Sequence, residues 1–193
     1  MELLSELIET VAAHKTVCDR FSDSEGTKML SAMYRTQKDK GERHAIIEKG
    51  VGEKDLKVGL IFSSMPASTP EAVGMFHTHT VNAGGKPLDN EIWAMLVGKH
   101  EVMCISQAKT VCYEPATSTA AEFYDILVMR ARGIQGGYNK FKSALEQKYG
   151  KFTIQTQEEK SVAQELKNRM GDVMTQAKRN SDWLFKTCTL GEQ

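Results

Sequence analysis

The sequence lacks a net charge. Its 193 residues carry 25 Lys and Arg against 25 Asp and Glu, so the formal net charge at pH 7 is zero. A neutral chain has no overall field that would attract nucleic acid or an anionic membrane surface. We therefore expect neither a nucleic-acid nor a membrane partner, and any partner must be recognised by a local surface.

Long apolar runs are also missing, and we expect no secretory signal. No stretch approaches the roughly 20 apolar residues that a membrane-spanning helix needs. The first residues, MELLSELIETVAAHK, mix acidic with apolar side chains and have no basic leader or small-residue cleavage pattern. These features favour a cytoplasmic protein.

The four cysteines show no CxxC spacing. Cys18, Cys104, Cys112 and Cys188 are scattered along the chain. This pattern favours reduced thiols in a cytoplasmic protein over a disulfide framework or a cysteine zinc site, although a hairpin could place Cys104 opposite Cys112.

The first part of the chain has the patterns of an α/β (α+β) core. Apolar residues from Leu3 to Ala12 recur at helical spacing and predict an amphipathic helix. A second helix is expected to begin at Asp89 or Asn90 and to end at Gly98. Short runs between turn-rich pieces predict the strands of a largely antiparallel sheet: KMLSAMYRT, RHAIIEKG, VGLIFSS, AVGMFHTH, and a hairpin of EVMCISQ and TVCYEP.

Beyond Pro115 the composition becomes helical. One helix is expected after Thr117, a second is expected to end at Gly150, and a long third is expected to run from about Gln157 to Arg179. The sequence therefore predicts an α/β core over residues 1–115 and a helical C-terminal extension over residues 116–193. The extension would pack on the core or on another chain, as in a homo-oligomer or a larger complex.

Two histidines stand at the end of an apolar strand. In AVGMFHTHT, the alternation of a strand directs His77 and His79 to one face, while Phe76 and Thr78 point to the other. Two converging imidazoles can bind one metal ion, and a catalytic zinc site adds a third protein ligand and keeps one position for water. Asp89 follows a glycine-containing loop at the start of a helix, where its carboxylate can turn toward the histidines.

These residues resemble the JAMM/MPN metalloproteases, a family that includes zinc-dependent deubiquitinating isopeptidases and prokaryotic relatives. The family hallmark is a glutamate on an upstream strand, then His-Ser/Thr-His, then Ser-x-x-Asp at the start of a helix. GMFHTHT matches the histidine element and KPLD the last element, and EVMCISQAKTVCYEP resembles the end of the family core. The resemblance covers residues 1–115 and implies a curved mixed sheet flanked by helices, with Zn²⁺ held by His77, His79 and Asp89.

The KPLD element departs from the family pattern. With Asp89 as the ligand, Lys86 stands at the serine position and the loop is one residue shorter than usual. The usual spacing would instead place Pro87 and Asn90 at the serine and aspartate positions, and an asparagine is a poor zinc ligand. Asp89 is the expected ligand and Glu91 is the alternative. Lys86 either replaces the serine as a cationic donor or faces solvent.

A base must also stand beside the metal-bound water. In the family it is a glutamate before a short glycine and aliphatic strand, and the run from Glu25 to Ala32 has this order. Glu25 is therefore the expected general base, and Glu42, Glu48 and Glu53 remain alternatives.

The resemblance implies a zinc metallopeptidase or isopeptidase. Such an enzyme would hydrolyse a peptide or isopeptide bond, and its substrate would be a protein, such as a ubiquitin-like carrier joined through its C-terminal glycine. The alternative is a catalytically inactive MPN-type scaffold that joins an assembly through its C-terminal helices.

Overall fold

The structure is a computed structural model that describes residues 16–21, 23–37, 41–50, 55–80, 87 and 89–190. The helix expected from Leu3 to Ala12, the alternative base Glu53 and the predicted donor Lys86 lie outside these residues. Within the described residues the chain has a mixed α/β fold, as the sequence predicts. No helix among them has the length and apolar content that crossing a membrane requires.

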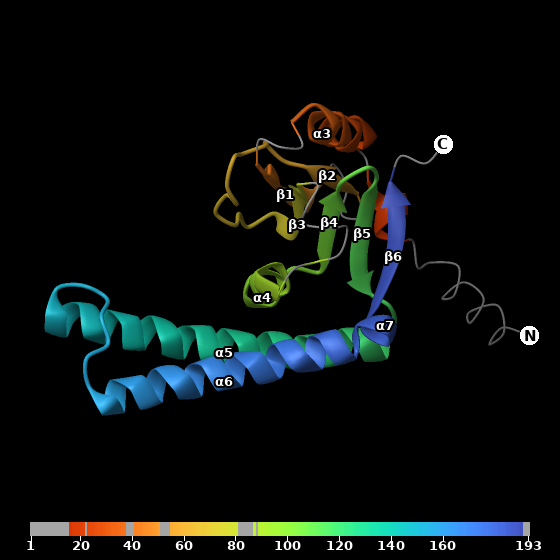
Figure 1. The fold of residues 1–193 in the computed structure, drawn as a ribbon. Helices are drawn as coiled ribbons and strands as arrows, with labels where there is room; N and C mark the ends of the chain where they lie inside the picture. The colour runs from red at the N-terminus through yellow and green to blue at the C-terminus, as the bar shows by residue number, and fades with distance from the viewer. Residues whose placement is uncertain are drawn as a thin grey trace, which may run out of the picture. The chain divides into compact units, whose positions relative to one another are not determined.

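Six strands form one mixed sheet in the order β2-β1-β3-β4-β5-β6 (Figure 1). Strand β3 pairs antiparallel with β1 and parallel with β4, and β4 pairs antiparallel with β5. The bounds of the strands are β1 His44–Lys49, β2 Leu56–Val58, β3 Ala72–Thr78, β4 Val102–Ser106, β5 Thr110–Pro115 and β6 Phe185–Leu190. The expected hairpin and the expected strand before the histidines are confirmed.

The chain divides into two compact units. The sheet unit contains residues 1–86, 100–114 and 187–193, and the helical unit contains residues 87–99 and 115–186. The helix that begins at Asp89 therefore belongs with the later helices, and the last strand returns to the sheet.

The sheet unit also contains the helices α2 Val17–Arg20 and α3 Ser24–Gln37. The prediction of a strand over KMLSAMYRT was wrong, because this segment is part of α3. Asp23 accepts a hydrogen bond from the backbone N–H of Gly26 at 2.9 Å, which satisfies a donor at the helix start. Thr27 and Leu30 are buried and Met33 is half-buried, and this spacing of three residues is helical and not the alternation of a strand.

Helix α3 covers an apolar core on one face of the sheet (Figure 1). Leu30 of α3 and Phe76 of β3 are fully buried in this core. Because side chains alternate along a strand, the burial of Phe76 on this face directs His77 to the opposite face. The other buried members are Val17, Ala45, Ile47, Leu56, Val58, Val102, Cys104 and Cys112.

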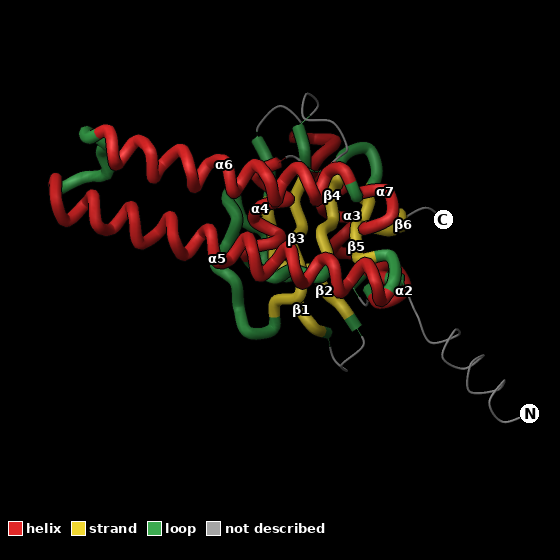
Figure 2. The backbone as a smooth tube through the Cα atoms, turned by 90° about the horizontal axis from the view of Figure 1, so that it is seen from below, coloured by secondary structure: helices red, strands yellow, loops and turns green. Residues whose placement is uncertain are grey.

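The helical unit consists of α4 Asp89–Val97, α5 Ser118–Tyr149, α6 Gln157–Arg179 and α7 Ser181–Leu184. The expected helix at Asp89 is confirmed. The two helices expected between Thr117 and Gly150 are one continuous helix, α5, which Thr117 caps at the start and Gly150 ends with a left-handed φ of 73°. Figure 2 shows α5 and α6 as two long neighbouring helices that are connected at one end.

The C-terminal segment is not helical to its end. After α7 the chain forms β6, which lies beside β5 in the sheet. This strand carries Cys188 into the sheet unit, and the expected run of helices to residue 193 did not include it.

All four cysteines are paired, so the prediction of reduced thiols was wrong. Cys104 bonds to Cys112, and Cys18 bonds to Cys188 across 170 positions of sequence. The hairpin register places Cys104 directly opposite Cys112, as the sequence allowed. The second pair could not be read from spacing, because it depends on the return of β6 to the sheet.

Candidate metal centre

His77 is the last residue but one of strand β3, and His79 follows directly after the strand ends. On one side, His77 stands opposite His44 in the antiparallel register of β1. The backbone N–H of His79 donates to the carbonyl of Ser106 in β4 at 2.9 Å, which extends the strand geometry past Thr78. Both histidines therefore lie between two neighbouring strands that fix their backbone positions.

Thr78, between the two histidines, bonds the end of β3 to the residue before β1. Its backbone N–H donates to the carbonyl of Arg43 and its hydroxyl accepts from the backbone N–H of Arg43, each at 2.8 Å. This double contact fixes the direction of the chain between the two histidines.

The predicted convergence of His77 and His79 is confirmed. Their Nε2 atoms lie 3.0 Å apart, their ring centroids lie 4.8 Å apart, and each residue is only 1% exposed. At this distance one ring nitrogen can donate to the other only if the imidazoles carry their protons on different atoms. Two neutral imidazoles with their Nε2 lone pairs directed to one point are also the usual nitrogen ligands of a metal ion.

The distance between the two Nε2 atoms fits one zinc ion closely. A tetrahedral zinc with Zn–N bonds of about 2.0–2.1 Å separates two ligand nitrogens by about 3.4 Å. The pair therefore needs to open by only a few tenths of an ångström. His77 and His79 fit a metal ion by residue type, burial and separation.

A third histidine, His44, extends the pair into a row. Its ring is stacked on that of His77, with centroids 5.9 Å apart and an interplanar angle of 21°. The backbone of His44 exchanges two hydrogen bonds with Phe62, at 2.9 and 2.8 Å, which holds the strand on its other side. The local pattern around His44, where it alternates with Ala45 and Ile46, predicted only a structural or exposed residue, because the strand register that places it opposite His77 is a long-range feature.

Glu42 lies at the outer end of this row. Its Oε2 atom is 3.8 Å from Nε2 of His44, and its side chain is 31% exposed. The row Glu42, His44, His77 and His79 thus combines a partly solvent-exposed carboxylate with two fully buried histidines. Glu42 was one of the alternatives to Glu25, and its position immediately before a histidine-containing strand is the signal that could have ranked it higher.

Glu25 lies in a different setting from the one expected. It is in the first turn of α3 and not in a loop before a strand, and its side chain is 83% exposed. Its carboxylate is 3.1 Å from Lys28 one turn along the same helix. The pattern that selected Glu25 required a strand after it, so the structural reason for that choice is lost.

The two candidate carboxylates of α4 differ in their surroundings. Asp89 has a 67% exposed side chain, and its Oδ1 atom lies 2.9 Å from Nζ of Lys178 on α6. Glu91, in the same first turn, is buried and 8% exposed. Within the helical unit, therefore, Asp89 makes a surface ion pair, and Glu91 is the carboxylate withdrawn from solvent.

No family model matches the chain, and a search of curated proteins finds no match either.

Proposed function

We propose that the chain is a zinc-dependent hydrolase of the JAMM/MPN type that cleaves peptide or isopeptide bonds. The observation that carries the proposal is the buried pair His77 and His79, whose Nε2 atoms converge to 3.0 Å at the end of a sheet strand. Neutral imidazoles are common metal ligands, and the separation of these two Nε2 atoms is close to that of two nitrogen ligands on one tetrahedral zinc ion.

The third ligand we propose is Glu91. A buried carboxylate is kept in a protein when it is paired or binds a metal, and exposure distinguishes the two candidates: Glu91 is withdrawn from solvent, whereas Asp89 is exposed and bound to Lys178. Asp89, the ligand expected from the KPLD element, instead has a local role in joining α4 to α6.

The general base we propose is Glu42. A base needs both a position beside the metal and access to water. Glu42 meets the second condition with a 31% exposed side chain, and its neighbour His44 is stacked on the ligand His77. When bound, zinc would lower the pKa of its water and polarise the carbonyl of the scissile bond. Glu42 would take a proton from that water and pass it to the leaving amine.

The substrate we propose is a protein joined through the C-terminal glycine of a ubiquitin-like carrier. This part rests on the resemblance of the histidine and KPLD elements to the family alone. The alternative of an inactive scaffold predicts a chain that binds no zinc and keeps its partners when His77 is changed.

Metal content of the purified protein tests the ligands. We expect about one zinc ion per chain when its thiols are kept oxidised, and loss of that ion in His77→Ala, because three protein ligands are typical of a catalytic zinc site. Glu91→Gln should weaken zinc binding, and Asp89→Asn is its matched control in the same helical turn and should not. Full zinc occupancy in His77→Ala would refute the site.

Hydrolysis tests the base. The probes are a ubiquitin-like carrier joined to lysine by an isopeptide bond and a panel of quenched peptides. We expect Glu42→Gln to keep its zinc and to lose hydrolysis, while Glu25→Gln, the matched control on α3, keeps both. An active Glu42→Gln protein would exclude this role, and absent zinc in the wild type would favour the scaffold.

A further inference from the structure

Four cysteine sulfurs converge at a second place in the sheet unit. They come from four separate elements: Cys18 from α2, Cys104 from β4, Cys112 from β5 and Cys188 from β6. The Sγ atoms of Cys18, Cys112 and Cys188 all lie within 4.8 Å of one another. The fourth, Cys104, is bonded to Cys112. The two disulfides are therefore not independent crosslinks but neighbours in one sulfur cluster.

We propose that this cluster is a redox-dependent zinc site, distinct from the histidine centre. When oxidised it holds the two disulfides, and when reduced the same four sulfurs bind one Zn²⁺ as thiolates. A tetrahedral zinc with Zn–S bonds of about 2.3 Å separates its sulfurs by about 3.8 Å. The sulfurs of Cys18, Cys112 and Cys188 already lie within 4.8 Å of one another. Opening of the disulfides and rotation of the cysteine side chains can therefore bring the four sulfurs to this spacing.

The surroundings of the cluster suit a thiolate centre. Cys104 and Cys112 are 0% and 1% exposed, and Cys18 and Cys188 are half-buried against the same apolar core. The backbone N–H of Cys18 donates to Sγ of Cys188 at 3.2 Å. Backbone donors to sulfur stabilise the negative charge of metal-bound thiolates and tune the site. Thiolates also favour zinc over the hard cations that prefer oxygen.

The change from the oxidised to the zinc-bound state requires a dithiol reductant and Zn²⁺. Two molecules of a dithiol reductant give four electrons and four protons to the two disulfides, and each reductant is oxidised to its own disulfide. The four thiols then lose their protons as Zn²⁺ binds. Two molecules of an oxidised dithiol reverse the process and release the ion.

In both states the cluster would fasten the same segments. Cys18 and Cys188 are 170 positions apart, and the hairpin of β4 and β5 lies between them in sequence. Zinc binding would therefore keep α2 and β6 attached to the sheet when a reducing environment opens the disulfides.

The test is a cobalt titration of the full chain carrying both His77→Ala and His79→Ala. This variant lacks the proposed catalytic ligands, so sulfur-to-cobalt charge-transfer absorption reports the cysteines alone. With the protein reduced by a phosphine under nitrogen, we expect about one cobalt ion per chain with this absorption and its displacement by zinc. The same variant left oxidised is the matched control and should bind none. Absence of the absorption in the reduced variant would overturn the proposal.

A cysteine variant completes the test. Adding Cys112→Ser should lower the absorption and weaken cobalt binding, because only three thiolates remain. Cys188→Ser, in the last strand, serves if that protein fails to fold. Unchanged absorption in a folded cysteine variant would equally overturn the proposal. In the wild type, zinc that persists after oxidation and disappears with His77→Ala reports the histidine site separately, so either proposal can fail without the other.

Discussion

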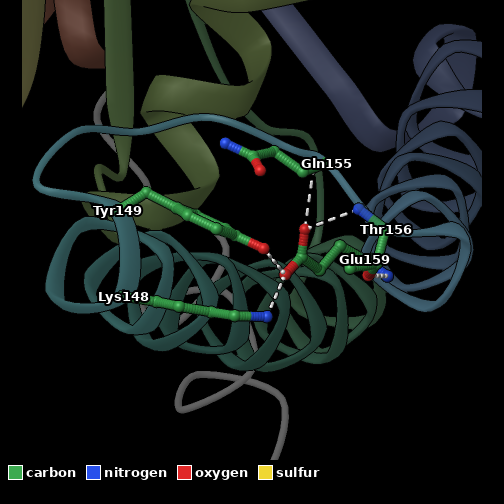
Figure 3. Close-up of polar contacts among 5 residues, drawn as sticks. All are labelled: Lys148, Tyr149, Gln155, Thr156 and Glu159. Carbon is green, nitrogen blue, oxygen red and sulfur yellow. Dashed lines mark hydrogen bonds and ion pairs between the residues drawn. The ribbon is translucent and has the colours of Figure 1, made fainter.

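Glu159 shows how one carboxylate can join the end of one helix to the start of the next. Its Oε1 atom accepts from Nζ of Lys148 at 2.9 Å and from the hydroxyl of Tyr149 at 2.8 Å, both at the end of α5. Its Oε2 atom accepts from the backbone N–H groups of Gln155 and Thr156 at the start of α6 (Figure 3). Both oxygens are fully used, and the connection between the helices is fixed by this one side chain.

These donors make the connection sensitive to acid. The backbone N–H groups of Thr156 and Gln155, with the ammonium of Lys148, lower the pKa of Glu159 from 4.5 to about 2. A carboxyl whose pKa is lowered on folding stabilises the fold above its unfolded pKa, and this contribution is lost as the pH falls toward the folded value. We expect the thermal midpoint of the wild type to fall between about pH 4.5 and pH 2 more steeply than that of Glu159→Gln.

The control for Glu159 is Glu165→Gln, which changes an exposed glutamate of the same helix. It should follow the wild type at every pH. At neutral pH Glu159→Gln should already have the lower midpoint, because the new amide group faces two donors that it cannot accept from. Equal midpoints of Glu159→Gln and the wild type at neutral pH would show that the contacts do not contribute.

His100 is a second acid-sensitive position, in the sheet unit. Burial lowers the pKa of His100 from its ordinary 6.5, because an imidazolium ion would lose its hydration. The unfolded chain then binds a proton more readily than the folded one, so stability falls as the pH drops below about 6.5. We expect the urea midpoint of the wild type to decrease from about pH 8 to pH 5 more than that of His100→Gln. Parallel pH profiles of the two proteins would contradict the prediction.

The pairing of β3 with β4 depends on a residue without a side chain. Gly74 stands opposite Val102 in the parallel register, and a Cβ atom on Gly74 would lie 2.3 Å from Cγ1 and 2.4 Å from the carbonyl oxygen of Val102. No such contact is tolerated, so the strands could approach this closely only with glycine. The same pair of strands positions His77 and His79.

Gly74→Ala should therefore destabilise the protein by about 1–3 kcal/mol, as overpacking in a core does. Gly136→Ala in α5 is the matched control, because a Cβ there meets no atom within 4 Å. That change should stabilise the protein by about 0.5–1 kcal/mol, since alanine favours a helix interior over glycine. Denaturant unfolding measures both, and a neutral Gly74→Ala would show that the strands can separate without cost.

Helix α3 shows that a strand pattern can be misread at the scale of an element. KMLSAMYRT was predicted as a short extended run between turn-rich segments, but its buried positions follow the spacing of a helix. The preceding Asp23 and Gly26 are the local signal that identifies a helix start. This error led to Glu25 as the base, because the family pattern was aligned to a strand that does not exist.

At the scale of the whole molecule, the long helices α5 and α6 make up most of the helical unit. Toward the end where α5 and α6 are connected, a cavity of about 290 Å³ is lined mainly by apolar residues that include Ile134, Tyr138, Phe152, Leu166 and Met170. Helices α5 and α6 approach closely at Gly137, where a Cβ would lie 3.5 Å from Cδ2 of Leu166. A short linker can therefore connect α5 to α6 at this position.

We expect removal of residues 138–165, with Gly137 linked to Leu166 through a short glycine and serine turn, to leave zinc content unchanged. The proposed ligands all lie outside the removed part. Far-ultraviolet circular dichroism should show less helix, and elemental analysis should show the same metal per chain. Loss of zinc in a folded shortened protein would mean that the far end of α5 and α6 supports the metal centre.

The sequence by itself determined the features that depend on neighbouring residues. Alternation along β3 was enough to place His77 and His79 on one face, and turn and capping residues were enough to predict α4 and the hairpin of β4 and β5. Only the tertiary structure decided the pairing of distant segments. His44 opposite His77, Asp89 bound to Lys178, and Cys18 bonded to Cys188 each depend on strand register or helix packing between residues far apart in sequence. Strand register and helix packing are set by how much apolar surface the whole chain can bury, and a local sequence pattern contains no information on which distant segments bury one another.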